Sequence, residues 1–273
     1  MPALHDSITH LKPEDRGRVI VSGSHAGVYA AYVAARDGAR AVILNDAGRG
    51  LEGAGIAGLG YLGDMGLPAA AVGHETARIG DAADMMRRGV ITVVNDQAAA
   101  LGVRVGQRCA EAVNRLLAAW PLDLSPPPYE ESRFLLRDGP VKVWGVDSAA
   151  LVGPQDAGHV ILTGSHGALL GGKPEYALRV AGLAGLYHDA GIGIDRAGTT
   201  RLPALDTRGI AGATVAAATA RIGDARSMWA TGRISTINDT ARRAGAAVAI
   251  AGPESADAII AHAAYTKRQE TPG

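Results

Sequence analysis

Apolar residues along the chain fall alternately into short continuous runs and into longer segments with helical spacing. Residues 28–35 and 56–65 have the spacing of helices and are followed by glycines, which commonly end helices. Four mostly apolar runs predict strands that are buried on both faces: residues 18–22, 41–44, 69–72 and 90–94. Strands of this kind, separated by helices, predict a mostly parallel sheet with helices on both sides.

The same order of segments occurs twice, which indicates an internal duplication. In the longest match roughly 25 of about 58 positions are identical. We predict an α/β fold: a tandem duplication of a Rossmann-like or flavodoxin-like three-layer unit with mostly parallel sheets, the copies forming a pseudo-two-fold pair. The matching segments are residues 6–27 with 147–168, residues 45–102 with 188–245 and, more faintly, residues 106–117 with 252–263.

A proline-rich segment between the copies sets the expected domain boundaries. Residues 1–120 form the first α/β copy, residues 121–146 the connecting segment and residues 147–273 the second copy. Three successive prolines at 126–128 favour an extended backbone and prevent a helix there. The residues Asp138-Gly139-Pro140 predict a turn within the same segment.

Composition and charge narrow the classes of function. The chain has 27 basic and 27 acidic residues and a pI of about 7.1, which gives no field for attracting nucleic acid or an anionic membrane. Cys109 is the single cysteine. Residues 1–17 lack the apolar core of a signal peptide and no apolar run of about 18 residues follows, so we expect neither a signal peptide nor a membrane span. We therefore expect a cytoplasmic protein that acts on a small molecule, and its many Gly and Ala residues favour a homo-oligomer.

Polar residues follow the predicted strands in both copies. In parallel sheets ligands bind beyond the carboxyl ends of the strands, so these residues are candidates for a ligand site. Gly-Ser-His after the first strand recurs after its counterpart, so we predict catalytic roles for Ser24, His25, Ser165 and His166. The alternative is that Ser24 caps the following helix and His25 packs locally. All the loops after strands are expected to meet at one edge of the sheet.

Asp46 and Asp189 stand at strand ends before glycine-rich crossovers. A carboxylate there can orient an imidazole, accept substrate hydroxyls or hold a metal, or it can pin its own turn. Arg78 and Arg221 can pair with the aspartate three residues on, or grip a substrate carboxylate. We predict substrate binding for these arginines and for Asp46.

Two further pairs of residues are repeated. Asn95 and Asn238 follow strands, and we predict substrate binding for them, with helix capping as the alternative. Asp81 and Asp224 precede short helices that end at glycine, so capping is the favoured interpretation for these aspartates.

The differences between the copies matter because a substrate rarely has two-fold symmetry. His188 replaces Asn45 and stands next to Asp189, whereas His74 and Glu75 have alanine counterparts in the second copy. We therefore expect His188 and Asp189 to form an acid/base pair and the second copy to be the catalytic one.

No cofactor is predicted. Glu52 inside the glycine-rich stretch 50–60 would face a pyrophosphate, which disfavours NAD, and aromatic residues at 4% disfavour a ring-stacked cofactor. A divalent metal is an alternative, although no H-x-H or H-E-x-x-H spacing supports it. Its ligands would come from His25, His74, His166, His188, Asp46 and Asp189.

These residues predict a metabolic enzyme whose small carboxylate-bearing substrate binds between the two copies. Hydrolysis of an amide or ester bond is the first expectation, because Ser, His and Asp are expected at one edge of the sheet. A lyase or isomerase that transfers protons through histidine is the second. A non-catalytic ligand-binding protein is the third.

Overall fold

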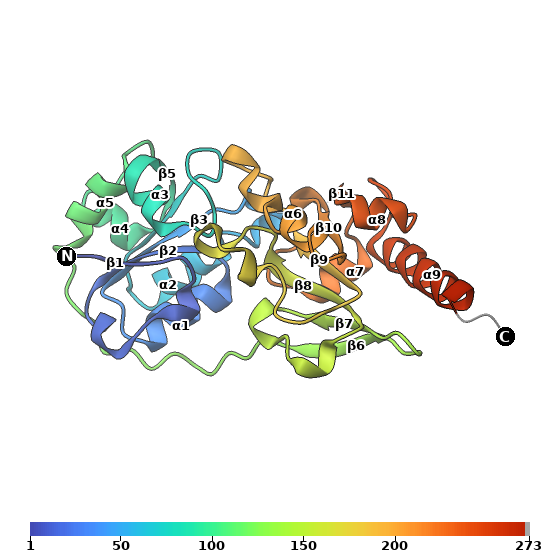
Figure 1. The fold of residues 1–273 in the computed structure, drawn as a ribbon. Coiled ribbons are helices and arrows are strands. Elements are labelled where there is room, and N and C mark those ends of the chain that lie inside the picture. The colour runs from blue at the N-terminus through green and yellow to red at the C-terminus, as the bar shows by residue number, and fades with distance from the viewer. Residues whose placement is uncertain (271–273) are drawn as a thin grey trace. The chain divides into compact units, whose positions relative to one another are not determined.

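The computed structural model describes residues 1–270 and divides into two units by its internal contacts. Unit 1 contains Met1–Glu130, Leu170–Gly172 and Ala190–Gly198, and unit 2 contains the other described residues. The units therefore differ from the sequence copies, because two short segments of the second copy belong to unit 1. Each unit is built on one sheet interleaved with helices, which confirms the predicted α/β fold with mostly parallel sheets (Figure 1).

Unit 1 has a five-stranded sheet in the order β1-β2-β3-β4-β5. Its strands are β1 (Ala3–His5), β2 (Val19–His25), β3 (Ala41–Asn45), β4 (Ala69–Val72) and β5 (Ile91–Val94). Its α-helices are α1 (Val28–Arg36), α2 (Ala57–Asp64), α3 (Ala82–Arg88), α4 (Asp96–Ala100) and α5 (Cys109–Leu116). Its short 3₁₀ helices include η1 (Ile8–His10), η2 (Pro13–Asp15), η3 (Leu51–Gly53) and η6 (Leu170–Gly172).

Two helical layers cover this sheet because alternate strand residues point to opposite faces. Val42 and Leu44 pack with α1 and α2, whereas Ala41 and Ile43 pack with α3 and α5. All four side chains are fully buried, so the continuous apolar runs in the sequence reflect a strand covered on both sides.

Unit 2 has a six-stranded sheet in the order β11-β10-β9-β8-β7-β6. Its strands are β6 (Arg133–Arg137), β7 (Val143–Val146), β8 (Val160–His166), β9 (Ala184–His188), β10 (Ala211–Val215) and β11 (Ile234–Ile237). Its α-helices are α6 (Arg201–Asp206), α7 (Ala225–Ala230), α8 (Asp239–Arg243) and α9 (Gly252–Glu270). Its 3₁₀ helices include η4 (Ala149–Leu151), η5 (Pro154–Asp156), η7 (Pro174–Tyr176) and η9 (Ala217–Thr219), while η8 (Ile194–Thr199) starts in unit 1.

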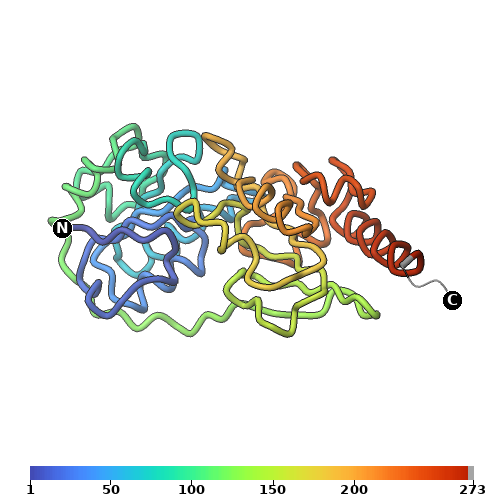
Figure 2. The backbone as a smooth tube through the Cα atoms, in the orientation of Figure 1, coloured from blue at the N-terminus to red at the C-terminus, as the bar shows by residue number. Residues whose placement is uncertain are grey.

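The predicted connecting segment contains both extended chain and sheet. Residues 121–130 run without helix or strand, as the prolines require (Figure 2). The predicted turn at 138–140 joins the antiparallel strands β6 and β7, which form one edge of the second sheet.

The fifth strand of unit 1 corrects one prediction. β5 pairs antiparallel with β4, with Val94 opposite Ala70 and Ile91 next to Val72. β11 pairs antiparallel with β10 in the same way. The carboxyl ends of these strands therefore lie at the opposite edge of each sheet from those of the parallel strands.

Residues 167–183, which connect β8 to β9, form no counterpart of α1, and the buried Arg201 side chain contacts this segment. In unit 1 the matching residue is Gly58, where an added Cβ would lie 2.5 Å from the carbonyl oxygen of Gly27. The Arg201 guanidinium instead donates hydrogen bonds to the carbonyl oxygens of Ala168 (3.0 Å) and Ala177 (2.9 Å). Arg201 is 4% exposed, so these hydrogen bonds satisfy a buried guanidinium.

Among residues 1–270, no helix has the length and apolar character needed to cross a membrane.

Candidate active site

The ends of the parallel strands of unit 1 bring three sequence segments together. His25 at the end of β2 lies opposite Asn45 at the end of β3, and Asn45 lies opposite Val72 at the end of β4. Asp46 and the loop that contains His74 follow directly. This edge is where the polar loops were expected to meet.

Asp46 forms the centre of this edge. Its Oδ1 lies 2.8 Å from Nδ1 of the His74 ring and also accepts a hydrogen bond from the His74 backbone N–H at 2.9 Å. Its Oδ2 accepts a hydrogen bond from the hydroxyl of Thr92 on β5 at 2.9 Å. The Gly48 N–H donates to Oδ1 at 3.2 Å, so Asp46 also pins its own turn.

These hydrogen bonds keep the Asp46 carboxyl ionised. Burial alone would raise its pKa, but the hydrogen bonds from the His74 ring, the His74 backbone and Thr92, with the charge of His74, hold the pKa below the usual value for aspartate. An ionised carboxylate can only accept, so Nδ1 of His74 is the donor in this pair. In the neutral ring Nε2 is then the basic nitrogen.

A loop from the second copy, within unit 1, borders His74. The Ile194 N–H donates to the carbonyl oxygen of His74 at 2.9 Å. A Cβ added to Gly191 would lie 2.8 Å from Nε2 of His74, so only glycine leaves room for the imidazole there. Glu75 and residues 191–194 line an open pocket of about 280 Å³, so the loop that packs against the ring also forms a pocket wall.

Both glycine-rich loops after the third strand of each copy have an unusual backbone. Residues 47–50 all have positive φ values, as do residues 190–193. Ala47, Arg49, Ala190 and Ile192 are not glycine, and each costs about 1 kcal/mol or more in this conformation. Such strain is typical of functional sites, and here it borders the Asp46 and His74 pair.

The Gly-Ser-His triplets have local structural contacts in both copies. They form the last residues of β2 and β8, which corrects their predicted place in loops. The Ser24 hydroxyl accepts a hydrogen bond from the Ile8 N–H, and Ser165 accepts one from Ala149, each at 2.9 Å. Ser24 therefore fixes η1, and the N-cap of α1 is Gly27.

The two histidines of these triplets also bond to nearby backbone. Nδ1 of His25 accepts a hydrogen bond from the Gly27 N–H at 3.1 Å, and Nδ1 of His166 accepts one from Ala168 at 3.3 Å. The catalytic roles of Ser24, His25, Ser165 and His166 stay predictions. Their shared backbone contacts are sufficient to explain why both copies contain the triplet.

The structure gives His188 a buried position. The imidazole is fully buried and its Nε2 lies 3.1 Å from the carbonyl oxygen of Ala220. Asn45, its counterpart, donates to the carbonyl oxygen of Ala77 at 3.4 Å. The two residues thus link corresponding strand ends to corresponding loops. The imidazole that packs against a pocket-lining residue, Gly191, is that of His74 in the first copy. Asp189 accepts a hydrogen bond from the Ala217 N–H at 2.9 Å, as Asp46 does from His74.

The prediction that Asn95 and Asn238 share the edge with the other polar loops is wrong. The antiparallel course of β5 and β11 carries them to the opposite edge. Asn95 caps α4 by accepting from the Ala98 N–H, and Asn238 caps α8 by accepting from the Ala241 N–H. Helix capping, the alternative interpretation, is therefore what the structure shows for Asn95 and Asn238.

The arginines lie at exposed positions beside carboxylates. Within unit 1, Nε of Arg78 donates to Asp195 at 2.9 Å. Arg221 lies 3.4 Å from Asp224. Asp81 and Asp224 accept from backbone N–H groups at the starts of α3 and α7, which confirms the predicted caps.

Sequence reasoning did not identify Thr92 or residues 191–194 as part of the site. The sequence did contain a clue to His74, because the second copy has alanine at the corresponding position. Among the described residues, no group of three or more His, Cys, Asp or Glu side chains is arranged to hold a metal ion.

No family model, curated protein or solved structure matches the chain.

Proposed function

We propose that the protein is an enzyme of small-molecule metabolism that transfers protons through the Asp46 and His74 pair. The observation that carries this proposal is the 2.8 Å contact between an ionised, buried carboxylate and an imidazole whose neighbours Glu75 and Gly191 line an open pocket. A carboxylate that accepts from Nδ1 orients the ring and stabilises its protonated form, which is how imidazole bases are held in enzymes.

Hydrolysis of an amide or ester bond in a small carboxylate-bearing substrate is the reaction we favour. Nε2 of His74 would remove a proton from a water molecule as the water attacks the carbonyl carbon, and would then pass that proton to the leaving group. Asp46 would keep its negative charge throughout. Arg78, which Asp195 holds next to residue 194, supplies a positive charge for the substrate carboxylate.

The same pair supports a lyase or isomerase, because removal of a proton from carbon needs the same base. A hydrolase and an isomerase incorporate different atoms from the solvent into the product. Hydrolysis in H₂¹⁸O places one ¹⁸O atom in the product, whereas an isomerase in D₂O introduces deuterium at carbon.

The proposal is tested by incubating the purified protein with a metabolite extract and following its components by mass spectrometry. Wild type should consume at least one small carboxylate, and His74→Asn should consume it about 10²- to 10⁴-fold more slowly, the usual contribution of a general base. Asp46→Asn should show a similar loss, because the neutral amide no longer stabilises a protonated ring.

His10→Asn is the matched control, since His10 is an exposed histidine of the same unit. Circular dichroism and melting temperature show whether each variant is folded. Consumption that is unchanged in a folded His74→Asn variant would refute the proposed role. A ligand that binds wild type and His74→Asn equally, with no turnover by either, would favour the ligand-binding alternative.

A further inference from the structure

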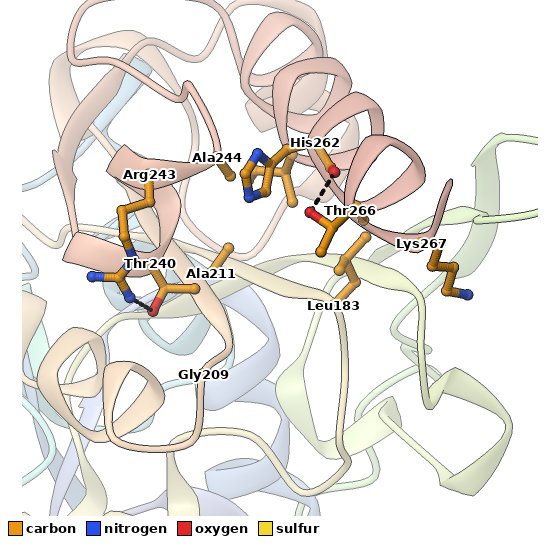
Figure 3. A pocket seen from close by; sticks show the side chains of 11 residues that line it. Leu183, Gly209, Ala211, Thr240, Arg243, Ala244, His262, Thr266 and Lys267 are labelled. Carbon is orange, nitrogen blue, oxygen red and sulfur yellow. Dashed lines mark hydrogen bonds between the residues drawn. The ribbon is translucent and has the colours of Figure 1, made fainter. Parts of the chain in front are cut away.

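A second pocket, of about 320 Å³, lies in unit 2. Helices α8 and α9 border it, together with the residues that precede and begin β9 and β10, so it lies at the amino ends of these parallel strands (Figure 3). Its apolar wall includes Leu183, Ala211, Ala244 and Ile259. The volume lies within the range of small-ligand sites.

The duplication shows that the pocket is open because of particular residues. Ala244 corresponds to Leu101 of unit 1, and His262 corresponds to Leu116 in the fainter match. Leu116 is fully buried, and Leu101 packs against the same core cluster. In unit 1 these leucines fill space under the helices, whereas the shorter alanine and the exposed histidine of unit 2 leave that space open.

The rim of the pocket is basic. Arg243 on α8 and Lys267 on α9 both line it, and His262 projects from α9 toward α8 (Figure 3). Arg243 donates a hydrogen bond to the Thr240 hydroxyl at 3.0 Å, which positions its guanidinium at the rim. None of the described residues that line the pocket is acidic.

We propose that this pocket binds a small amphiphilic carboxylate, with its carbon chain against the apolar wall and its carboxylate at Arg243. Apolar surface buried in the wall supplies affinity, and the guanidinium fork supplies a charge-assisted contact with the anion. The site is separate from the Asp46 and His74 pair, since it lies in unit 2.

The test is isothermal titration of the full chain with butanoate, octanoate and dodecanoate, with 1-octanol as the uncharged probe. Octanoate should bind more tightly than butanoate, because the wall contacts more of its chain. 1-Octanol should bind at least tenfold more weakly than octanoate, because it carries no charge for the arginine. If none of the three carboxylates binds wild type, the proposal is wrong.

Variants separate this pocket from nonspecific binding. Arg243→Ala should weaken octanoate about tenfold or more, whereas Arg242→Ala, an exposed neighbour that pairs with Asp239, should leave affinity unchanged. Ala244→Leu should abolish binding by introducing the residue that unit 1 already has at this position. Equal octanoate affinity in wild type, Arg243→Ala and a folded Ala244→Leu would overturn the proposal.

Discussion

The imidazole of His188 is enclosed by protein, and this burial lowers its pKa. The hydrogen bond to the Ala220 carbonyl and the charge of Asp189 act in the opposite direction, but burial dominates. His188 is therefore neutral in the folded protein over a range of pH in which a histidine of the unfolded chain gains a proton. Its contact with Ala220 links a strand end to a loop, as the contact of Asn45 with Ala77 does without a titrating group.

Acid should consequently destabilise unit 2 through His188. The folded pKa lies below the unfolded value of 6.5, so the unfolded chain binds more protons below that pH, and stability is lost as the pH falls through it. The loss approaches about 1.4 kcal/mol per pH unit until the folded protein also titrates. His188→Asn should remove this component.

Urea unfolding between pH 5 and 8 measures the effect. Trp144 and Trp229 both lie in unit 2, so a Trp120→Phe background restricts the fluorescence signal to that unit. His262→Asn, at an exposed histidine, is the control and should follow wild type. Parallel pH curves for wild type and His188→Asn would contradict the prediction.

The strained loops after β3 and β9 have the same backbone conformation in both copies, with positive φ at four successive residues. Within unit 1 the two loops meet: a Cβ added to Gly48 would lie 2.8 Å from Cα of Gly191. Gly48 also has a φ of 68°, so a side chain at this position would meet both backbone strain and a close neighbour.

Gly48→Ala should therefore lower the free energy of unfolding of unit 1 by more than the conformation alone requires. Gly17 is the matched control, because it has a similar φ of 73° and nothing within 4 Å of an added Cβ. Gly17→Ala should cost about 1 kcal/mol, and Gly48→Ala at least about 1 kcal/mol more. Chemical unfolding of both variants measures the difference, and equal losses would show that the two loops do not pack closely in solution.

Elements were easier to predict than their directions. The apolar runs located β3 and β4 to within one residue, because a strand buried on both faces needs continuous apolar sequence. The same pattern describes a strand that runs either way, so it did not predict that β5 is antiparallel. Asn95 was misplaced for that reason.

The candidate site was predicted only in part. Asp46 was found because it follows a strand, but its partner His74 lies 28 residues further along, on a loop whose path the sequence does not give. The adjacent residues His188 and Asp189 suggested a pair more readily. Neighbours on a strand point to opposite faces, which is why proximity in sequence was a poor guide.

The two sequence copies do not coincide with the two structural units. The segments Leu170–Gly172 and Ala190–Gly198 belong to unit 1 although they come from the second copy. Backbone hydrogen bonds fix them there, from Gly171 to the carbonyl of Gly80 and from Ile194 to that of His74. Arg78 and Arg88 also contact Asp195.

After cleavage within the connecting segment, the two fragments should therefore stay associated. A protease site inserted at residues 126–128, where the backbone has no helix or strand, would allow cleavage after folding. Size-exclusion chromatography in native buffer should show both fragments in one peak at the mass of the intact chain. Elution of separate fragments would show that Leu170–Gly172 and Ala190–Gly198 do not bind the second fragment to residues 1–130.

The placement of Ala190–Gly198 also determines when the first unit can be finished during synthesis. Residues 1–130 leave the ribosome before the loop that packs against His74, which is translated some 60 residues later. At about 5–20 residues per second this delay lasts several seconds. Through that interval the nascent chain has its first sheet but not the complete surroundings of His74, so any chemistry at this imidazole must wait for the second copy to emerge.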